Sequence, residues 1–164
     1  MTQTEPLSST ILAAISLGAE AALDAAMGLF GCQVGTVHWL GADGLLTLAA
    51  QRNLPPPIVS MVQTVPIGKG IAGLAAERRE PVSLCNLQTD TSGQARPAAK
   101  TTGMEGSIAV PMLVNGELRG VLGIAKIEAH DWNDAEKASL LRIAALLGEQ
   151  RPLLSAHEKK PTKP

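Results

Sequence analysis

The stretch SIAVPMLVNGELRGVLGIAKI, residues 107–127, decides the fold. Asn115-Gly116 separates two runs of β-forming residues, and this dipeptide is the strongest short-range signal for a β-hairpin. The earlier stretch VGTVHWLGADGLLTLAAQ, residues 34–51, repeats the pattern around Asp-Gly turn chemistry. Two hairpins of this kind predict a sheet that is largely antiparallel.

Helices are expected at both ends of this sheet sequence. Apolar residues recur at helical spacing over residues 7–27, and Gly28 and Gly31 are expected to end that helix. Asn133 and Glu136 form a capping box, which predicts the start of a C-terminal helix. The chain therefore begins and ends its fold with a helix.

The segment between the hairpins is expected to be irregular. A short helical turn is predicted over residues 55–62, a second short helix over 70–79 and a third strand over 81–87. Residues 88–105 are rich in small and polar residues and predict a long functional loop with one helical turn. These elements together predict an α+β domain.

Length and composition limit the classes to which the protein can belong. The 164 residues suit one domain over 1–155 with a solvated tail over 156–164, and 45% hydrophobic residues can supply a core. The net charge of -1 and the aromatic content of 2% provide no basic, base-stacking surface. Nucleic acid is therefore not expected as a partner.

The N-terminal sequence and the cysteines indicate a cytoplasmic protein. Residues 1–10 lack the basic region of a signal peptide, and Glu20 and Asp24 interrupt the following apolar stretch well before membrane-spanning length. Cys32 and Cys85 lie outside any metal-binding or redox motif and are expected to be reduced and buried. No membrane partner is expected.

Residues 68–73, GKGIAG, match the G-x-G-x-x-G pattern of a dinucleotide-binding loop, and Asp90 stands where a ribose-binding acid would lie. Such a loop must follow an apolar strand, whereas Gln63 and Pro66 interrupt the preceding segment. The antiparallel hairpin downstream also leaves no second βαβ unit. The glycines are therefore interpreted as a tight strand-to-helix turn, with Gly73 allowing the helix to approach the sheet.

The same stretch, together with the hairpin that follows, resembles a GAF domain, a small-molecule-sensing module of signalling proteins. The resemblance is strong over residues 65–147 and weaker over 7–62, and two departures from the family pattern are Cys85 and Asn86. It implies a GAF/PAS-like central antiparallel sheet of five to six strands, with terminal helices on one face and the loop over the other. The matching positions are Pro66, Gly68, Gly70, Gly73, Pro81, Val82, Asp90, Ser107, Val110, Pro111, Gly120, Val121 and Leu122.

A ligand pocket is expected beneath the long loop. Arg96 and Lys100 suit an anionic ligand, although exposed loop cations are more often solvated. Asp90 could equally cap a turn, and Met104 could simply pack. The candidate ligand-binding residues are Cys85, Asn86, Asp90, Arg96, Lys100, Met104 and Ser107.

His38 and Trp39 occupy adjacent positions of the first strand, so one faces the pocket and the other faces the helices. The alternation of side chains along the strand does not show which of the two residues faces the pocket. His38 as a haem or metal ligand is a weaker alternative, because no histidine has a second ligand at metal spacing. The patterns for bilin attachment and cyclic-nucleotide binding are not recognisable, and the cofactor remains unspecified.

The resemblance favours a sensory domain that acts in signal transduction without catalysis. An enzyme alternative comes from the GAF-like free methionine-(R)-sulfoxide reductases, which use cysteines near this loop. The strand order 2-1-5-4-3 implied by the resemblance puts Cys32 and Cys85 about 14 Å apart, whereas a disulfide spans at most about 7 Å between Cα atoms. Cys85 acting alone as an oxidation sensor remains a further alternative.

The third class of function is an interaction module with an empty pocket. The terminal helices could pair in a homodimer as a four-helix bundle, with Ala19, Ala22 and Ala26 permitting close approach. The alternative is that this small-residue stripe packs only on its own sheet. Any signal is expected to leave through the dimer or through a separate output protein.

Overall fold

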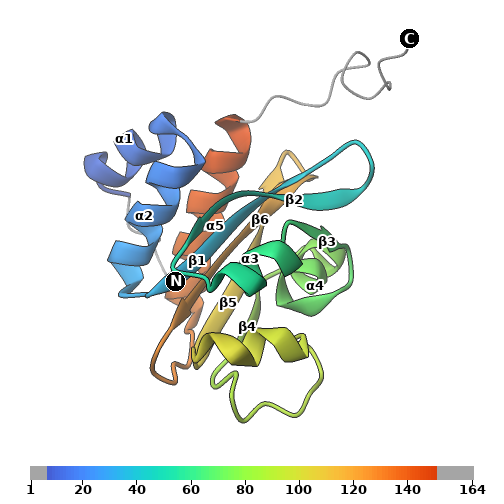
Figure 1. The fold of residues 1–164 in the computed structure, drawn as a ribbon. Coiled ribbons are helices and arrows are strands. Elements are labelled where there is room, and N and C mark those ends of the chain that lie inside the picture. The colour runs from blue at the N-terminus through green and yellow to red at the C-terminus, as the bar shows by residue number, and fades with distance from the viewer. Residues whose placement is uncertain (1–6, 151–164) are drawn as a thin grey trace.

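The computed structural model describes residues 7–150, apart from the side chain of Ala98, and the predicted tail over 156–164 lies outside this range. It contains one antiparallel sheet of six strands in the order β3-β2-β1-β6-β5-β4 (Figure 1). This order agrees with the predicted 2-1-5-4-3 arrangement, with one short strand added at the edge. The strands are β1 (Val34–Leu40), β2 (Leu45–Arg52), β3 (Thr64–Pro66), β4 (Val82–Leu84), β5 (Gly106–Val114) and β6 (Glu117–Lys126).

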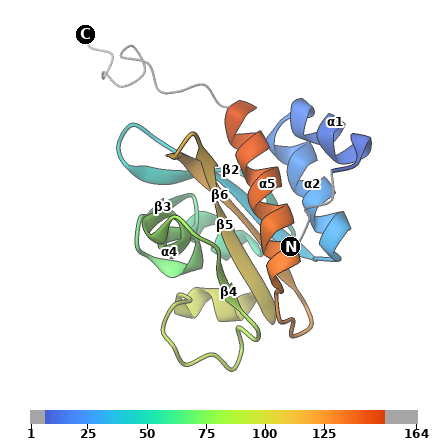
Figure 2. The same ribbon diagram turned by 180° about the vertical axis from the view of Figure 1, so that it is seen from behind.

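Helices lie on both faces of the sheet, as the α+β prediction required. Figure 2 shows the N-terminal and C-terminal helices side by side on one face, and Figure 1 shows the shorter helices over the other. None of the helices in residues 7–150 is long and apolar enough to span a membrane. The helices are α1 (Ser9–Leu17), α2 (Ala19–Phe30), α3 (Pro56–Met61), α4 (Gly70–Arg78) and α5 (Asp134–Gln150), with a 3₁₀ helix, η1, over Pro97–Thr102.

The hairpin of β5 and β6 forms the centre of the sheet. Asn115 and Gly116 both have positive φ, 52° and 79°, as the two central positions of a type I′ turn require. Pairing continues from Val114 with Glu117 to the far end of both strands. Strand β1 then pairs with the free edge of β6, which brings the two predicted hairpins together.

The helices α1, α2 and α5 bury one face of the sheet. Leu23 from α2 and Leu140 from α5 are fully buried against Leu122 of β6. The predicted capping box starts α5, because the Glu136 N–H donates to Asn133 Oδ1 at 2.8 Å and the Asn133 N–H donates to Glu136 Oε1 at 3.0 Å. This face holds the main hydrophobic core.

Two details of the N-terminal helix differ from the prediction. The expected helix over 7–27 is broken into α1 and α2 at Gly18, whose φ of +119° lies outside the helical region. Gly28 lies inside α2, and Gly31 in the left-handed conformation ends it. A glycine inside a helix costs only about 1 kcal/mol, which the packing of α2 outweighs.

The alanine stripe proposed for dimer contacts packs within the molecule itself. Ala22 and Ala26 are 1% and 0% exposed in the same core as α5. They are therefore closed to a second subunit. The outward apolar side chains of α1 and α2 are instead Leu12, Leu17 and Leu29.

The strand β3 was missed by sequence reasoning because it is three residues long and contains Pro66. It pairs with β2 at the edge of the sheet, where a proline is tolerated because its missing N–H faces away from the ladder. The glycine turn after it behaves as predicted. A Cβ on Gly73 would lie 2.6 Å from the Pro66 carbonyl oxygen, so only glycine allows α4 this approach.

Candidate functional site

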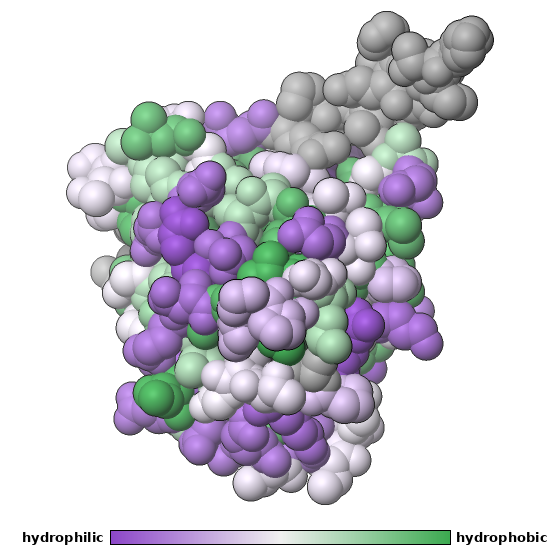
Figure 3. Space-filling view, viewed as in Figure 1, coloured by the Kyte–Doolittle hydropathy of each residue, from purple (hydrophilic) through white to green (hydrophobic). Residues whose placement is uncertain are grey.

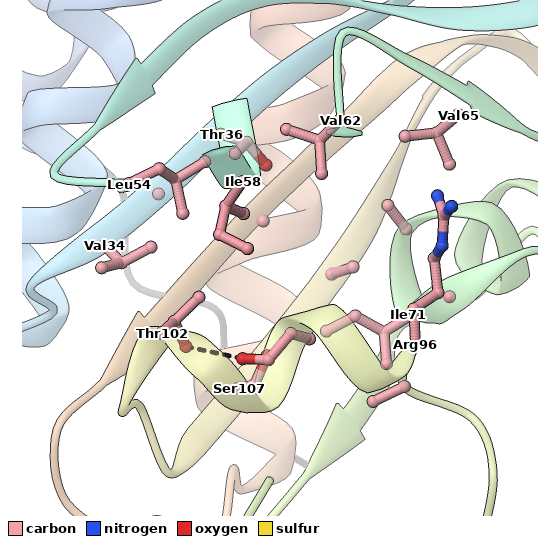
Figure 4. Close-up of a pocket in the computed structure, with 18 of the residues that line it drawn as sticks. Val34, Thr36, Leu54, Ile58, Val62, Val65, Ile71, Arg96, Thr102 and Ser107 are labelled. Atoms are coloured by element: carbon pink, nitrogen blue, oxygen red, sulfur yellow. Dashed lines mark hydrogen bonds between the residues drawn. The ribbon is translucent and has the colours of Figure 1, made fainter. Parts of the chain in front are cut away.

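A cavity of about 160 Å³ lies between the sheet and the elements α3, α4 and η1 (Figure 4). Its lining draws on β1, β5 and β6 below and on the short helices above. Most of the lining side chains are apolar. They include Val34, Leu54, Ile58, Met61, Val62, Val65, Ile71, Leu87, Ala109 and Ala125.

The floor of the cavity exists because the central strands carry small residues on this face. Gly123 of β6 pairs with Thr36 of β1 on one side and with Ala109 of β5 on the other. A Cβ on Gly123 would lie 3.2 Å from Thr36 Oγ1. The neighbouring Leu122 points to the opposite face and joins the helix core. Alternation along the strand therefore leaves space on one face and fills the other.

The roof is built from α3 and η1. Proline starts both elements, at Pro56 and Pro97, where the absent N–H costs nothing and φ is already set for a helix. The Ile58 side chain of α3 is buried and points into the cavity in Figure 4. Gln88 fixes the end of η1 by donating from Nε2 to the carbonyl oxygens of Lys100 and Met104, at 2.9 Å and 2.8 Å.

His38 fastens the roof to the sheet. Its side chain, 2% exposed, lines the cavity from β1, while Trp39 packs against the helix core, which resolves the orientation that alternation left open. Nε2 donates to the carbonyl oxygen of Val62 at 2.8 Å, directly after α3. Burial lowers the pKa of His38, so the imidazole is neutral at pH 7. Nδ1 is then an acceptor, and it has no partner among the described residues.

Two hydroxyl groups also border the cavity. Thr36 lies on β1 and Ser107, 5% exposed, lies on β5. The Thr36 hydroxyl makes no hydrogen bond with another residue of the described chain, whereas Figure 4 marks a hydrogen bond between the side chains of Ser107 and Thr102. Buried polar groups in folded proteins nearly always have a partner, so the Thr36 hydroxyl is available to a bound molecule.

Two cations stand among the lining residues on the roof side. Arg96 precedes η1, and its aliphatic stem lies over Gly70, since a Cβ there would come within 3.2 Å of Arg96 Cγ and Cδ. The guanidinium group points towards Val65 in Figure 4. Lys69 also lines the cavity and precedes Gly70 in the glycine turn. Both are exposed, and the structure gives neither side chain an ion pair within residues 7–150.

The face that carries the roof holds hydrophilic and apolar side chains side by side (Figure 3). Met61 of α3, which also lines the cavity, is 52% exposed there. The nearby Ile67 is 40% exposed. The cavity is therefore approached through a surface of mixed polarity.

Of the seven ligand-binding candidates from the sequence, Arg96 and Ser107 line the cavity. The other five lie outside the lining. Asp90 caps a turn instead, because its carboxylate accepts from the Ser92 N–H at 3.2 Å and from Ser92 Oγ at 2.6 Å. Lys100 donates from Nζ to the Asp90 carbonyl oxygen at 3.0 Å. These polar side chains hold the loop in shape.

The remaining three candidates also have local roles. Asn86 Oδ1 accepts from the Gln88 N–H at 3.0 Å. Met104 packs against Val34 and Ala125 in a small cluster beside the cavity. Cys85 follows the edge strand β4 and is exposed, which corrects the prediction that it is buried.

The two cysteines are far from forming a catalytic pair. Cys32 precedes β1 and Cys85 follows β4, and strands β6 and β5 lie between them. Burial raises the pKa of Cys32 to about 12, so its thiol stays protonated at neutral pH. Neither cysteine lines the cavity. Within residues 7–150 no group of three or more His, Cys, Asp and Glu side chains is placed to hold a metal ion.

Sequence reasoning missed Thr36, Lys69 and Gly123, because it searched for polar residues on the long loop. The sequence did contain a signal for Thr36. It lies two residues before His38 on the same strand, so the two side chains share a face. Gly123 could have been noted as a glycine inside a β-rich run, which often marks a close approach of ligand or backbone.

Comparison with known proteins agrees with the fold. A family model for the GAF domain matches residues 19–149. No curated protein gives a significant match. The structure is similar to the GAF domain of a phosphoenolpyruvate-protein phosphotransferase from Coxiella burnetii, with a TM-score of 0.71, 22% identity, and 85% and 84% of the two chains covered.

The structure is also similar to those of two enzymes. The free methionine-R-sulfoxide reductase from Neisseria meningitidis gives a TM-score of 0.64 at 17% identity, covering 85% of this chain and 76% of that one. The type II enzyme from Thermoplasma acidophilum gives 0.65 at 20% identity, covering 80% and 87%. At these identities the likeness concerns the fold alone.

Proposed function

Because the chain belongs to the GAF domain family, we propose that it is a small-molecule-binding regulatory domain, acting in signal transduction without catalysis. The cavity between the sheet and η1 is the observation that carries the proposal. Its volume of about 160 Å³ is close to that of an engineered apolar cavity, about 150 Å³, that holds benzene. An apolar enclosure with a few polar groups is the usual form of a ligand site.

A molecule in this cavity can affect both layers of helices. It contacts α3 and η1 above, and β1 and β6 below. The opposite face of the same two strands carries α2 and α5. Binding changes the output only if it stabilises one arrangement of these helices over another. The His38 to Val62 hydrogen bond, at 2.8 Å, connects the roof to β1.

The position of the cysteines supports a function without thiol catalysis. Reduction of a sulfoxide by a protein thiol needs a thiolate at the bound substrate and a second thiol to resolve the product. Cys32 is protonated, and neither thiol lines the cavity. The reductases of similar fold therefore provide no residue assignment for this chain.

The output is proposed to pass through a homodimer in the cytoplasm, or through a separate signalling protein. The outward face of α1 and α2 carries the contact in this proposal, since Leu12, Leu17 and Leu29 are exposed there. Burial of such side chains is worth about 1.5–3 kcal/mol each when complete.

Native mass spectrometry and thermal unfolding of the full chain test the proposal. We expect a small retained molecule, or a compound from a panel of benzene-sized probes, to bind and be recovered with unchanged mass. A probe at 100 times its Kd should raise the unfolding free energy by about 2.7 kcal/mol and Tm by roughly 5–10 °C.

Ala109→Leu fills the cavity and should abolish this binding, whereas Ala49→Leu makes the same change at an exposed position of β2 and should not. Gly123→Ala is the milder second variant, should Ala109→Leu unfold. The proposal fails if neither a retained molecule nor a Tm shift is found for the wild type, or if a bound probe is chemically converted.

A further inference from the structure

The charges around the cavity define the class of ligand. Of the residues that line it, Lys69 and Arg96 are cationic, His38 is neutral, and none is Asp or Glu. We propose that the site selects a small monocarboxylate, whose apolar body of about benzene size fills the cavity and whose carboxylate pairs with Arg96 and Lys69. This inference rests on the proposed function and specifies its ligand.

The two cations differ from Arg52, a cation of the same molecule that already has partners. Arg52 forms ion pairs with Asp24 at 2.7 Å and with Glu20 at 3.2 Å. The structure gives Arg96 and Lys69 no such partner in residues 7–150. Arg96 is nonetheless held in place, because its stem packs over Gly70. A guanidinium fixed in this way can bind a carboxylate through two parallel hydrogen bonds.

The interior limits the ligand to a single charge. A second carboxylate would have to enter a space surrounded by Ile58, Val62 and Ile71, where an unpaired charge is strongly unfavourable. Only one end of the ligand reaches the cations, so dicarboxylates and nucleotides do not suit the cavity.

An ammonium group is also disfavoured. In an α-amino acid it would lie beside the carboxylate, and therefore beside Lys69 and Arg96, with no acidic residue in the lining to pair with it. Like charges at this distance repel. The site should therefore distinguish a monocarboxylate from an amino acid with the same side chain.

The test uses benzoate and benzamide, which have nearly the same shape and differ in charge, with benzylamine as the cation. Methyl NMR of the full chain reports binding through Ile58 and Ile71, and Ile143 in the helix core is the reference. We expect benzoate to bind about tenfold more tightly than benzamide, and benzylamine to produce no shift. Raising the salt concentration should reduce the advantage of benzoate.

Arg96→Gln should remove most of this advantage, so that the ratio of the benzoate and benzamide affinities falls towards one. Lys69→Gln should remove a smaller part. Arg142→Gln makes the same charge change at an exposed position of α5 and should leave both affinities unchanged. Benzamide binding by each variant also establishes that the variant is folded.

Two outcomes separate this inference from the proposed function. If benzamide binds as tightly as benzoate, or if the advantage of benzoate survives in the Arg96→Gln/Lys69→Gln double variant, the charge selection is wrong and the ligand-binding function stands. If isovalerate, isovaleramide, benzoate and benzamide all leave the cavity methyl signals unchanged, the proposed function is overturned together with this inference.

Discussion

The two faces of the sheet are made from the same strands and have opposite properties. On β6, Leu122 and Ile124 face the helices and are buried in a continuous core, whereas Gly123 and Ala125 face the cavity. On β1, Val37 is in the core and Thr36 is at the cavity. Large side chains at alternate positions supply stability to one face, and small ones at the intervening positions leave room on the other.

The difference indicates how the chain separates stability from function. The helix face is filled, so a change of volume there must disturb its neighbours. The cavity face already has empty space beside its side chains, so a change of side-chain volume there disturbs fewer neighbours. Matched substitutions on the two faces should therefore have unequal effects.

The largest difference is expected for a pair of isoleucines. Ile143→Ala on α5 removes a side chain that is 1% exposed in the core and should lower the unfolding free energy by about 2–5 kcal/mol. Ile58→Ala on α3 removes the same atoms beside the existing cavity, where fewer contacts are lost, and should cost about 1 kcal/mol. Chemical denaturation measures both, and equal losses would contradict the comparison.

A smaller difference is expected for a pair of glycines. A Cβ on Gly35 would lie 2.7 Å from Leu23 Cδ1 and 2.9 Å from Met27 Sδ, so Gly35→Ala requires these two buried side chains of α2 to shift. The expected cost is about 1–3 kcal/mol. A Cβ on Gly123 would meet only Thr36 Oγ1 at 3.2 Å, among side chains, and would project into the cavity.

Gly123→Ala should change the unfolding free energy by no more than about 0.5 kcal/mol, because the lost entropy of the unfolded chain offsets the contact. Its effect should appear as weaker binding of benzene-sized probes. Thermal unfolding of both variants, with and without a probe, measures the two effects separately. A Gly35→Ala variant as stable as the wild type would show that the helix layer is less tightly packed than the structure indicates.

The same contrast explains which parts could be predicted. The hairpin turn at Asn115-Gly116 and the capping box at Asn133 depend on residues close in sequence, and the sequence predicts both correctly. The break at Gly18 and the edge strand β3 depend on what the chain packs against. Local patterns do not contain that information.

The site was harder to predict for a different reason. The candidates were mostly polar residues of the loop. Most of them form hydrogen bonds within the loop, as Asp90 does with Ser92. The cavity is instead defined by small residues on the floor, Gly123 and Ala109, and by a roof that lies far away in sequence. The two candidates that do line the cavity are Arg96, within the loop and directly before η1, and Ser107, on β5 just after the loop.

The smallest expected effects are two pH dependences of the unfolding free energy. One comes from His38 on the cavity face and the other from Glu136 on the helix face. Burial holds the pKa of His38 below its ordinary value of 6.5. The unfolded chain therefore binds this proton first on acidification, and stability is lost as the pH falls from about 6.5 towards the folded pKa. The loss is at most about 1.4 kcal/mol per pH unit.

Glu136, at the start of α5, titrates in a lower range. Partial burial raises its pKa, but hydrogen bonds from the Asn133 N–H and from His130 outweigh this and hold the pKa below 4.5. Its contribution is present above about pH 4.5 and is lost as the pH falls through the folded pKa. His38→Gln should therefore flatten the stability profile only near pH 6, and Glu136→Gln only below about pH 4.5. Unfolding free energies measured from pH 7.5 to 3.5 test this, and a His38→Gln profile that keeps the step near pH 6 would mean that another group produces it.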